Sequence, residues 1–448
     1  MTAYEALLPR HLDTTIAGVR DTWRELQITG KPVCRSLQPI FIDRAFHDVA
    51  TRDAALVVRA FHIASAHMAP RLGLSRRILE LLELALAHPT VTMVRLDGFP
   101  RGESLAFLES NAIGQVTMPA GIGDGDVLRA AFLALPIMRE FAERFEVRDV
   151  STTALGVDAV IEAHRARGGT GLPTIAVVEV KSETGAAPRP VAQERDQLRL
   201  MNHATERGCR IRTCQPRELR FAEGRLQLGD ERVDVVFVAD DTGSYFEVCP
   251  DDAPILAAVR AGAVTLGDGF PLGALAHDKK TFDFLTDPDA GVPLDDDEAR
   301  AVRSCLPWTR ICADRRTTYH GEPVELRPFV LSNRDRLVLK PTSSYGGNGV
   351  VLGWRVGKVE WSAAVERAFG AGGYIVQERV HGAQVRLPML DDASEVRSRG
   401  VLFDLNPYVW MGTRSDGWWA RVSPSELMNV TAGEGSEVPV FVIESGGL

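Results

Sequence analysis

Two carboxylates and an amide lie close together in an apolar segment, VRLDGFPRGESLAFLESNAIG, from Val94 to Gly114. Glu109 and Asn111 are two residues apart, a spacing that puts both side chains on one face of a strand, and Asp97 can reach them from the preceding strand. Clustered acids are costly among Leu, Phe and Ala unless a cation offsets their charge. Their oxygens are hard ligands that suit Mg²⁺ bridging nucleotide phosphates. We therefore predict that this trio binds a metal ion.

One further charged residue on these strands is a candidate for contact with the reacting groups. Arg95 precedes Asp97 by two residues, so it shares its strand face and is placed to hold a γ-phosphate or an acyl phosphate. Asp404 and Asn406 in FDLNPY have the same i, i+2 spacing, but two polar groups on one strand face are more often a solvated face, which is how we interpret them.

A second cluster of candidates lies in RLVLKPTSSYGGNGVVLGW. Lys340 ends an apolar strand, where its ammonium can neutralise phosphate oxygens. The glycines that follow let backbone N–H groups approach the same anion; they are Gly346, Gly347 and Gly349. The segment is not a P-loop, because GxxxxGK[ST] is absent and the lysine precedes the glycines. Taken alone, a hairpin turn explains it equally well.

The next strand, GGYIVQERV, leaves an apolar core and carries polar groups at its end. Gln377, Glu378 and the backbone of Val380 are placed to line the edge of a nucleotide base. In the order lysine, glycine loop, polar strand, the segment resembles the ATP-grasp superfamily. That resemblance implies a second, upstream lysine, which HDKKTF supplies as Lys279 or Lys280; we favour Lys279.

The metal trio stands before the nucleotide loop, which reverses the usual ATP-grasp order. This order resembles the glutathionylspermidine synthase family, whose ATP-grasp fold is circularly permuted and whose Arg-x-Asp and Glu-x-Asn motifs stand in the N-terminal part. The family also carries a small α/β region between the two halves, matched here by TIAVVEV through DVVFVAD. The chain lacks a cysteine amidase domain, and its loop reads SSYGGNG where the family usually has Arg-Glu between glycines. Glutathione and spermidine are therefore not implied as substrates.

The resemblance implies an ATP- and Mg²⁺-dependent ligase that joins a carboxylate to an amine through an acyl phosphate and releases ADP and phosphate. Lys279 and Lys340 would stabilise the transferring phosphoryl group and Arg95 the acyl phosphate, while Arg421 in GWWARVS is a second candidate near the nucleotide. The substrates implied are small molecules: an amino acid, a peptide, a polyamine or an acyl group on a carrier protein. A phosphotransferase or a non-catalytic nucleotide-binding protein on the same fold remains an alternative.

The elements expected around these residues define an α/β (α+β) protein in three parts. Helical spacing in RAFHIASAHMAPRLGLSRRILELLELALAHP and the strands near Asp97 indicate a helical N-terminal part that encloses a short sheet with the metal-binding half of the permuted ATP-grasp, at 1–168. The β-branched run TIAVVEV opens a Rossmann-like α/β domain at 169–268. The nucleotide-binding part, at 269–448, opens with one helix, PLGALAHDKKTFDFLTD, and ends in antiparallel strands.

The composition of the chain argues against several classes of protein. The 448 residues carry a formal net charge of −9 with dispersed Lys and Arg, which argues against nucleic-acid binding. No stretch reaches 18 apolar residues, so we expect no membrane span and a cytoplasmic location. The six cysteines show no CxxC pair and are interpreted as reduced thiols. GIGDGD, at 121–126, lacks the later Glu of an EF-hand and is interpreted as a turn. The sequence does not indicate the oligomeric state.

Overall fold

The structure is a computed structural model of the 448-residue chain. It describes residues 3–28, 30–71, 76–87, 92–112, 121–179, 191–238, 253–267, 272–342, 344, 347–391, 393, 395–426, 428, 430 and 435–444.

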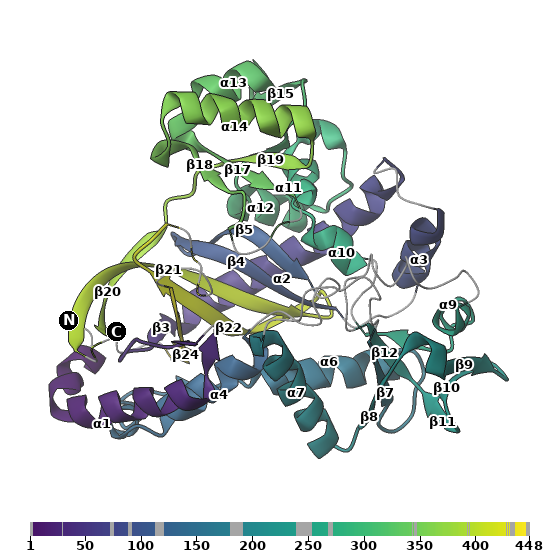
Figure 1. The fold of residues 1–448 in the computed structure, drawn as a ribbon, viewed down its shortest axis with the longest axis horizontal. Helices are drawn as coiled ribbons and strands as arrows, with labels where there is room; N and C mark the ends of the chain where they lie inside the picture. The colour runs from purple at the N-terminus through teal and green to yellow at the C-terminus, as the bar shows by residue number, and fades with distance from the viewer. Residues whose placement is uncertain are drawn as a thin grey trace.

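A six-stranded antiparallel sheet lies at the centre of the molecule (Figure 1). Its order is β23–β22–β21–β4–β5, and β20 also pairs with the long β21. The bounds are β4 (Met93–Arg101), β5 (Ser104–Ala112), β20 (Ala383–Leu390), β21 (Val396–Trp410), β22 (Arg414–Ser423) and β23 (Ser436–Val438). The sheet therefore combines strands from both ends of the chain.

The prediction of strands around Asp97 and Glu109 is confirmed, but the prediction that they form their own short sheet is wrong. β4 pairs with β21 through Tyr408, Val409 and Trp410. An isolated hairpin buries too little surface to be stable, so β4 and β5 need further strands to pair with. Those partners lie some 300 positions along the chain, where local periodicity gives no sign of the pairing. The strand β20 was also missed.

Helix α2 (Arg44–Met68) covers the apolar face of this sheet. The Asp43 carboxylate accepts a hydrogen bond from the backbone N–H of Phe46 at 2.7 Å and so caps the helix. An apolar stripe through Ala50, Ala54 and Phe61 packs on strand residues such as Leu96 and Leu405. The helices predicted for the first 90 residues are confirmed as α1 (Ala3–Glu25), α2, the 3₁₀ turn η1 (Ala69–Arg71) and α3 (Arg76–Ala87). The same stretch also holds three short strands that were not predicted, at 27–28, 31–32 and 40–43.

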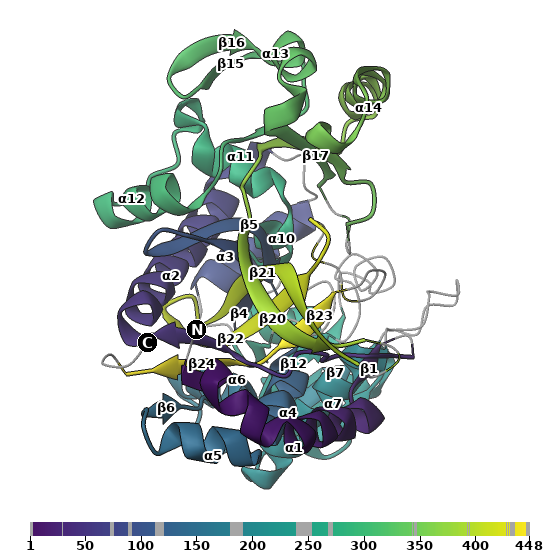
Figure 2. The same cartoon turned by 90° about the vertical axis from the view of Figure 1, so that its left-hand side faces the viewer.

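Further helices pack below the opposite face, as Figure 2 shows. They are α4 (Ile122–Leu133), α5 (Pro136–Ala142) and α6 (Thr152–Ala166). A small sheet lies beside them, with the order β3 (Ile40–Asp43), β24 (Val440–Ile443) and β6 (Val147–Arg148). The C-terminal strands were predicted to be antiparallel. This is wrong for β24, which runs parallel to β3, a partner about 400 residues away.

The central region contains a four-stranded parallel sheet, which confirms that TIAVVEV begins an α/β segment. Its order is β13 (Thr265–Leu266), β12 (Val235–Val238), β7 (Thr174–Val178) and β8 (Arg210–Cys214). Side chains of β7 and β12 are buried on both faces, under α6 and α7 (Val191–Glu206) on one side and α9 (Pro254–Arg260) on the other. A meander is appended to it: η2 (Pro216–Glu218), β9 (Leu219–Ala222), β10 (Arg225–Leu228) and β11 (Glu231–Val233).

A four-stranded antiparallel sheet, which we call the third sheet, stands above the central one in Figure 1. Its order is β14 (Thr309–Ile311), β19 (Tyr374–Glu378), β17 (Leu337–Pro341) and β18 (Val351–Leu352). Helices α13 (Leu326–Ser332) and α14 (Lys358–Ala371) cover it, and Trp361 is fully buried between them. Smaller elements complete the description: β1 (Gln27–Ile28), β2 (Lys31–Pro32), η3 (Pro288–Ala290), α12 (Asp296–Cys305), β15 (Arg316–Tyr319), β16 (Glu322–Glu325), η4 (Arg334–Arg336) and η5 (Gly353–Arg355).

The single helix predicted over PLGALAHDKKTFDFLTD is two helices, α10 (Leu272–His277) and α11 (Lys280–Thr286). Asp278 breaks the run, because its carboxylate accepts a hydrogen bond from the backbone N–H of Lys280 at 2.9 Å. In the break, the backbone N–H of Lys279 donates to the carbonyl of Thr342 at 3.2 Å. The interruption thus ties Lys279 to the end of β17.

Among the described residues, Cys34, Cys209, Cys214, Cys305 and Cys312 are free and buried, which confirms the interpretation as thiols for those five. Cys249 lies outside the described residues. Within the described ranges, no helix has the length and apolar content needed to cross a membrane. The three-part division at 168 and 268 remains a prediction, although the central sheet draws strands from the first and the last of these parts.

Candidate active site

A pocket with a volume of about 400 Å³ lies between the central sheet and the third sheet. The central sheet contributes four charged residues to its lining: Asp97, Glu109, Asp404 and Arg421. The third sheet and the segment before it contribute Lys279, Lys340 and the strand end at Gln377–Val380. A volume of this size is typical of pockets for small ligands.

Strand pairing brings the acids together. Asp97 is directly opposite Glu109 in the β4–β5 hairpin, and Arg95 is opposite Asn111. Opposed residues in an antiparallel pair point to the same face. The register therefore places Asp97, Glu109 and Asn111 on one face of the hairpin, as predicted. On the neighbouring strands, Asp404 of β21 is opposite Arg421 of β22.

Arg421 joins the two ends of the chain at this site. Its Nη2 donates to Asp97 Oδ2 at 2.8 Å and to Asp404 Oδ2 at 2.6 Å, and its Nε donates to Asp404 Oδ2 at 2.8 Å. Arg95 binds the other side of Asp97, with its Nε 2.8 Å from Oδ1. Both guanidinium groups lie over the ring of Trp419, at 4.0 Å for Arg95 and 4.7 Å for Arg421.

The pKa values of the two buried acids, Asp97 and Asp404, are shifted in opposite directions. Burial by itself raises the pKa of Asp97, but the positive charges of Arg95 and Arg421 outweigh it and hold that pKa below its ordinary value. Burial also raises the pKa of Asp404; there Arg421 compensates only in part and the nearby Asp97 charge adds to the increase. Asp97 is therefore the better-stabilised anion of the two.

The interpretation of Asp404 and Asn406 as a solvated face is wrong. Both side chains are buried. Asn406 Nδ2 donates to Asp404 Oδ1 at 2.8 Å, and Asn406 Oδ1 accepts from the backbone N–H of Gly98 at 3.1 Å. The face is covered because β21 is a central strand. Asp404 is thus a site residue that sequence reasoning set aside, although its spacing was visible.

Two lysines face the acids from the opposite wall. Lys279 Nζ lies 2.8 Å from Glu109 Oε1 and donates to the carbonyl of Ser344 at 3.1 Å. Lys340 Nζ donates to Gln377 Oε1 at 2.7 Å and is 3.4 Å from the carbonyl of Leu108. Burial is the largest cause that lowers the pKa of Lys340 to about 8, and nearby Glu109 opposes this shift.

Lys279 and Lys280 differ clearly in position. Lys279 is 4% exposed and lines the pocket. The side chain of Lys280 is 34% exposed, and its Nζ is 3.4 Å from Asp278. Lys279 is therefore the lysine within reach of a ligand in the pocket.

The remaining nucleotide candidates have mixed positions. Gly347, Glu378 and Val380 line the pocket, whereas Gly349 does not; with φ near +74°, Gly349 lies so close to Pro341 that a Cβ would be 2.7 Å from its Cγ. Gly346 lies outside the described residues. The Glu378 carboxylate accepts from the Tyr319 hydroxyl at 2.6 Å. Gln377 is buried and engaged with other protein groups.

Arg95 and Asn111 belong to the layer behind the pocket. Neither is among its lining residues. Arg95 directs its guanidinium at Asp97 and Trp419. Asn111 has a buried Nδ2 with no hydrogen-bond partner among the described residues. A phosphate contact by Arg95 and a metal contact by Asn111 remain predictions.

The acids of the pocket suit a hard cation that is also bound by a substrate. In the described part of the chain, no three His, Cys, Asp or Glu side chains form a ready-made metal cluster. Mg²⁺ generally takes one or two carboxylates and completes its shell with water and substrate phosphates. Asp97 and Glu109 are two carboxylates on one pocket wall, and Glu109 already faces a cation, Lys279. Their chemistry fits Mg²⁺ that enters with a nucleotide.

A carboxylate that sequence reasoning missed closes the outer rim of the pocket. Glu426 follows β22, and its Oε2 accepts from Trp354 Nε1 at 2.8 Å and from Arg355 Nε. Its Oε1 accepts from Arg379 Nη2 at 3.3 Å, and the Arg379 guanidinium lies 4.0 Å from the Trp354 ring centroid. We call Glu426, Trp354, Arg355 and Arg379 the rim clasp. It connects the central sheet to the third sheet, and the local sequence does not indicate it.

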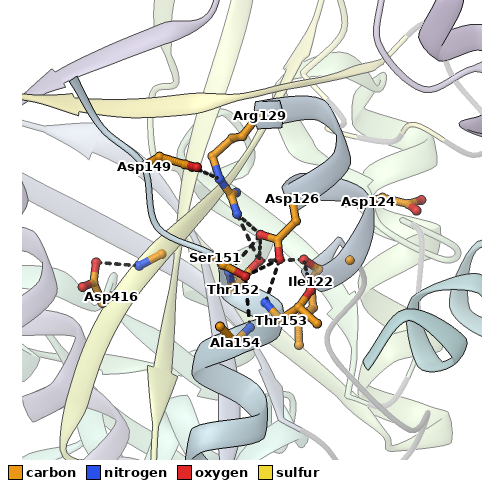
Figure 3. Close-up of polar contacts among 12 residues, drawn as sticks. Ile122, Asp124, Asp126, Arg129, Asp149, Ser151, Thr152, Thr153, Ala154 and Asp416 are labelled. Atoms are coloured by element: carbon orange, nitrogen blue, oxygen red, sulfur yellow. Dashed lines mark hydrogen bonds and ion pairs between the residues drawn. The ribbon is translucent and has the colours of Figure 1, made fainter. Parts of the chain in front are cut away.

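The GIGDGD segment is a helix N-terminus and not a turn. It opens α4, and the Asp196 carboxylate accepts from the backbone N–H groups of Gly121, Gly123 and Asp124 at 2.8 to 2.9 Å. Figure 3 shows Asp126, which accepts from the backbone N–H groups of Thr152 and Thr153 and joins α4 to the start of α6.

Comparison with known proteins supports the fold but does not define a family. No family model matches the sequence. A protein of Frankia alni named as a glutamate–cysteine ligase is 33% identical over 139 residues, which are 30% of this chain. The chain spans only 14% of the length of that relative.

Among solved structures, a glutathione synthetase-like effector from Globodera pallida is similar over 99% of this chain and 98% of its own, with a TM-score of 0.61 and 14% identity. A γ-glutamylcysteine synthetase structure from Methylobacillus flagellatus KT covers 84% of this chain and 86% of its own, with a TM-score of 0.41 and 13% identity. The chain therefore has a mixed α/β fold shared with a synthetase-like protein.

Proposed function

We propose that this protein is an ATP-dependent carboxylate–amine ligase with a circularly permuted ATP-grasp fold. One observation carries the proposal: a single pocket sets Lys279 and Lys340 opposite Asp97 and Glu109, which come from the other end of the chain. Cations on one wall and acids on the other are the arrangement that a metal-bound triphosphate requires.

The cationic and acidic residues of the pocket have different proposed roles. Lys279 and Lys340 bind phosphate oxygens and stabilise charge on the transferring group, while Asp97 and Glu109 hold Mg²⁺. When bound, Mg²⁺ would supply positive charge that offsets the charge of the phosphates. Arg421 keeps Asp97 ionised and oriented. Arg95 supports the same carboxylate, and we retain its contact with an acyl phosphate, and Asn111 as a third metal ligand, as proposals.

The chemistry needs two displacements. An oxygen of the substrate carboxylate attacks the γ-phosphorus, the bond to the β-phosphate oxygen breaks, and ADP leaves. The amine nitrogen of the second substrate then attacks the acyl carbon, phosphate leaves, and the nitrogen loses a proton. Little acid–base catalysis is required of the protein, since phosphate is a good leaving group and positioning lowers both barriers.

The substrates are proposed to be small molecules that carry a carboxylate and an amine, such as amino acids or peptides. The name of the Frankia relative supports this class. We keep the closer relation to the glutathionylspermidine synthase family, the three domains at 1–168, 169–268 and 269–448, and a cytoplasmic location as proposals.

ADP release against a panel of amino acids, peptides and amines, followed by product mass, tests the function. A ligase releases ADP and phosphate only when an acid and an amine are both present. A stable phosphorylated product would identify a phosphotransferase instead, and binding of ATP with no turnover under any pair would identify a non-catalytic protein. Equal ATP consumption with no acceptor would contradict the proposal.

Glu109→Ala provides the matching variant. Its side chain is partly exposed and its ion pair is with Lys279, so turnover should be lost while the fold remains intact. Glu103→Ala is the control, because Glu103 is exposed at the turn of the same hairpin. Circular dichroism of both variants should match that of the parent protein.

A further inference from the structure

Gln377 occupies a position that sequence reasoning assigned to the edge of a nucleotide base. The side chain is 1% exposed, although it contributes to the pocket wall next to Lys340. It lies on β19, which is hydrogen-bonded to β14 on one side and to β17 on the other. Thr309 and Val338 are its strand neighbours. The amide is thus fixed between two strands.

The direction of each hydrogen bond around this amide follows from a chain of donors. The Thr309 hydroxyl has one hydrogen, and it donates to the carbonyl of Pro307 at 3.0 Å. Towards Gln377 the hydroxyl can therefore only accept, and Gln377 Nε2 donates to it at 3.0 Å. This leaves the amide oxygen pointing away from Thr309. The orientation of the amide is thus set by the hydrogen-bond pattern.

That oxygen faces Lys340. The ammonium donates to Gln377 Oε1 at 2.7 Å, a distance typical of charge-assisted hydrogen bonds. The opposite orientation would direct an NH₂ group at an ammonium and would place two donors in contact. Lys340 is also partly buried, where a charge without a hydrogen-bond acceptor is costly. The amide oxygen offsets part of that cost.

Both ends of the amide are therefore occupied within the protein. The amide keeps one further N–H and one further lone pair, but the side chain is 1% exposed, so a nucleotide base could reach it only by displacing the groups that cover it. Glu378 and Val380, at the same strand end, are half-buried and line the pocket, so they are more accessible to a base edge than Gln377 is.

We propose that Gln377 is a positioning residue, which holds the ammonium of Lys340 at the phosphate end of the pocket and does not read the base. The chain from Pro307 through Thr309 and Gln377 to Lys340 fixes the lysine in advance of ligand binding. Because the Lys340 side chain is already held in place, less conformational entropy is lost when the ligand binds. The inference rests on the proposed function, since it takes Lys340 to be a phosphate ligand.

Binding of a non-hydrolysable ATP analogue with Mg²⁺, measured by calorimetry, tests the inference through a double-mutant cycle. Lys340→Met should weaken binding about tenfold or more, as expected for loss of one charge-assisted hydrogen bond. Gln377→Met should cause a smaller loss in the parent protein. In the Lys340→Met background it should have no further effect, because Gln377 acts through the lysine.

The outcomes separate the two proposals. If the parent protein binds no analogue, both the ligase proposal and this inference are overturned. If it binds, and the Gln377→Met loss is the same in both backgrounds, Gln377 contributes through the base or through general stability; the inference is then overturned while the ligase proposal stands.

A second pair of variants keeps the test decisive should Gln377→Met fold poorly. Thr309→Val retains the shape of the side chain but removes the hydroxyl that orients the amide, so analogue binding should weaken. Thr309→Ser restores the hydroxyl and should restore affinity to within about twofold. Equal affinities for the Val and Ser variants would contradict the proposed chain of hydrogen bonds.

Discussion

Replacement of Arg421 by methionine tests the charge network that joins the two ends of the chain. The substitution removes three hydrogen bonds to Asp97 and Asp404, at 2.6 to 2.8 Å. Asp97 keeps Arg95, whereas Asp404 keeps only neutral donors, Asn406 Nδ2 and the backbone N–H at position 421. Most of the cost should therefore arise from Asp404.

Removal of one partner of a buried ion pair costs about 3–5 kcal/mol. With a urea m-value of about 3 kcal/mol per M, Arg421→Met should lower the unfolding midpoint by about 1–2 M. Addition of Asp404→Asn removes the uncompensated charge, so the double variant should regain a large part of that loss. A double-mutant cycle on urea midpoints, followed by circular dichroism and tryptophan fluorescence, measures both effects.

The pH dependence of the same variant supplies an independent check. Burial already raises the pKa of Asp404, and loss of Arg421 raises it further. The folded state then binds a proton that the unfolded state has released, so the stability deficit should shrink as the pH falls from 7 towards 5. A midpoint shift below about 0.3 M, or an Asp404→Asn effect that is equally destabilising in both backgrounds, would refute this account of the site.

Three further predictions concern individual residues. Lys279→Met should reduce ADP release at least about 100-fold, while Lys280→Met, whose ammonium pairs with Asp278 at the surface, should stay within about twofold; equal effects would show that the pocket lysine is misassigned. Burial raises the pKa of Glu437 to about 8, so the parent protein loses stability as the pH rises from the ordinary pKa of a glutamate towards 8. Glu437→Gln should therefore have a higher melting temperature than the parent at pH 8.5 and nearly the same one at pH 5. A difference in melting temperature that does not change with pH would exclude this titration. Glu426→Ala should open the rim clasp and speed nucleotide dissociation in stopped-flow measurements, with less than about 1 kcal/mol lost in stability, and an unchanged dissociation rate would show that the clasp does not retain the ligand.

The sequence was most informative where a local pattern decides the structure. The loss of helical spacing, with turn-forming residues after each segment, located β4 and β5, and the β-branched run located β7, whose side chains are all buried. The spacing of Arg95, Asp97, Glu109 and Asn111 also gave their common face.

Local patterns could not show contacts that depend on distant partners. Asp404 was read as solvated because its burial comes from β4 and β22 on either side of β21, and β4 lies about 300 residues upstream. Gln377 was read as a base contact because its engagement with Thr309 is a cross-strand contact with β14. The helix break at Asp278 was within reach of the sequence, since aspartate favours caps over helix interiors.

The pairing of β4 with β21 has a consequence for how the protein is made. Asp97 and Arg421, one of the two arginines that bond to it, are 324 residues apart, so at ordinary translation speeds the hairpin leaves the ribosome well before its partner strands exist. During that interval its acidic face lacks Arg421, and its apolar face lacks neighbouring strands. Formation of the ligand pocket should therefore be a late, post-translational event, and a nascent chain arrested before β21 should be vulnerable to proteolysis or aggregation at the hairpin.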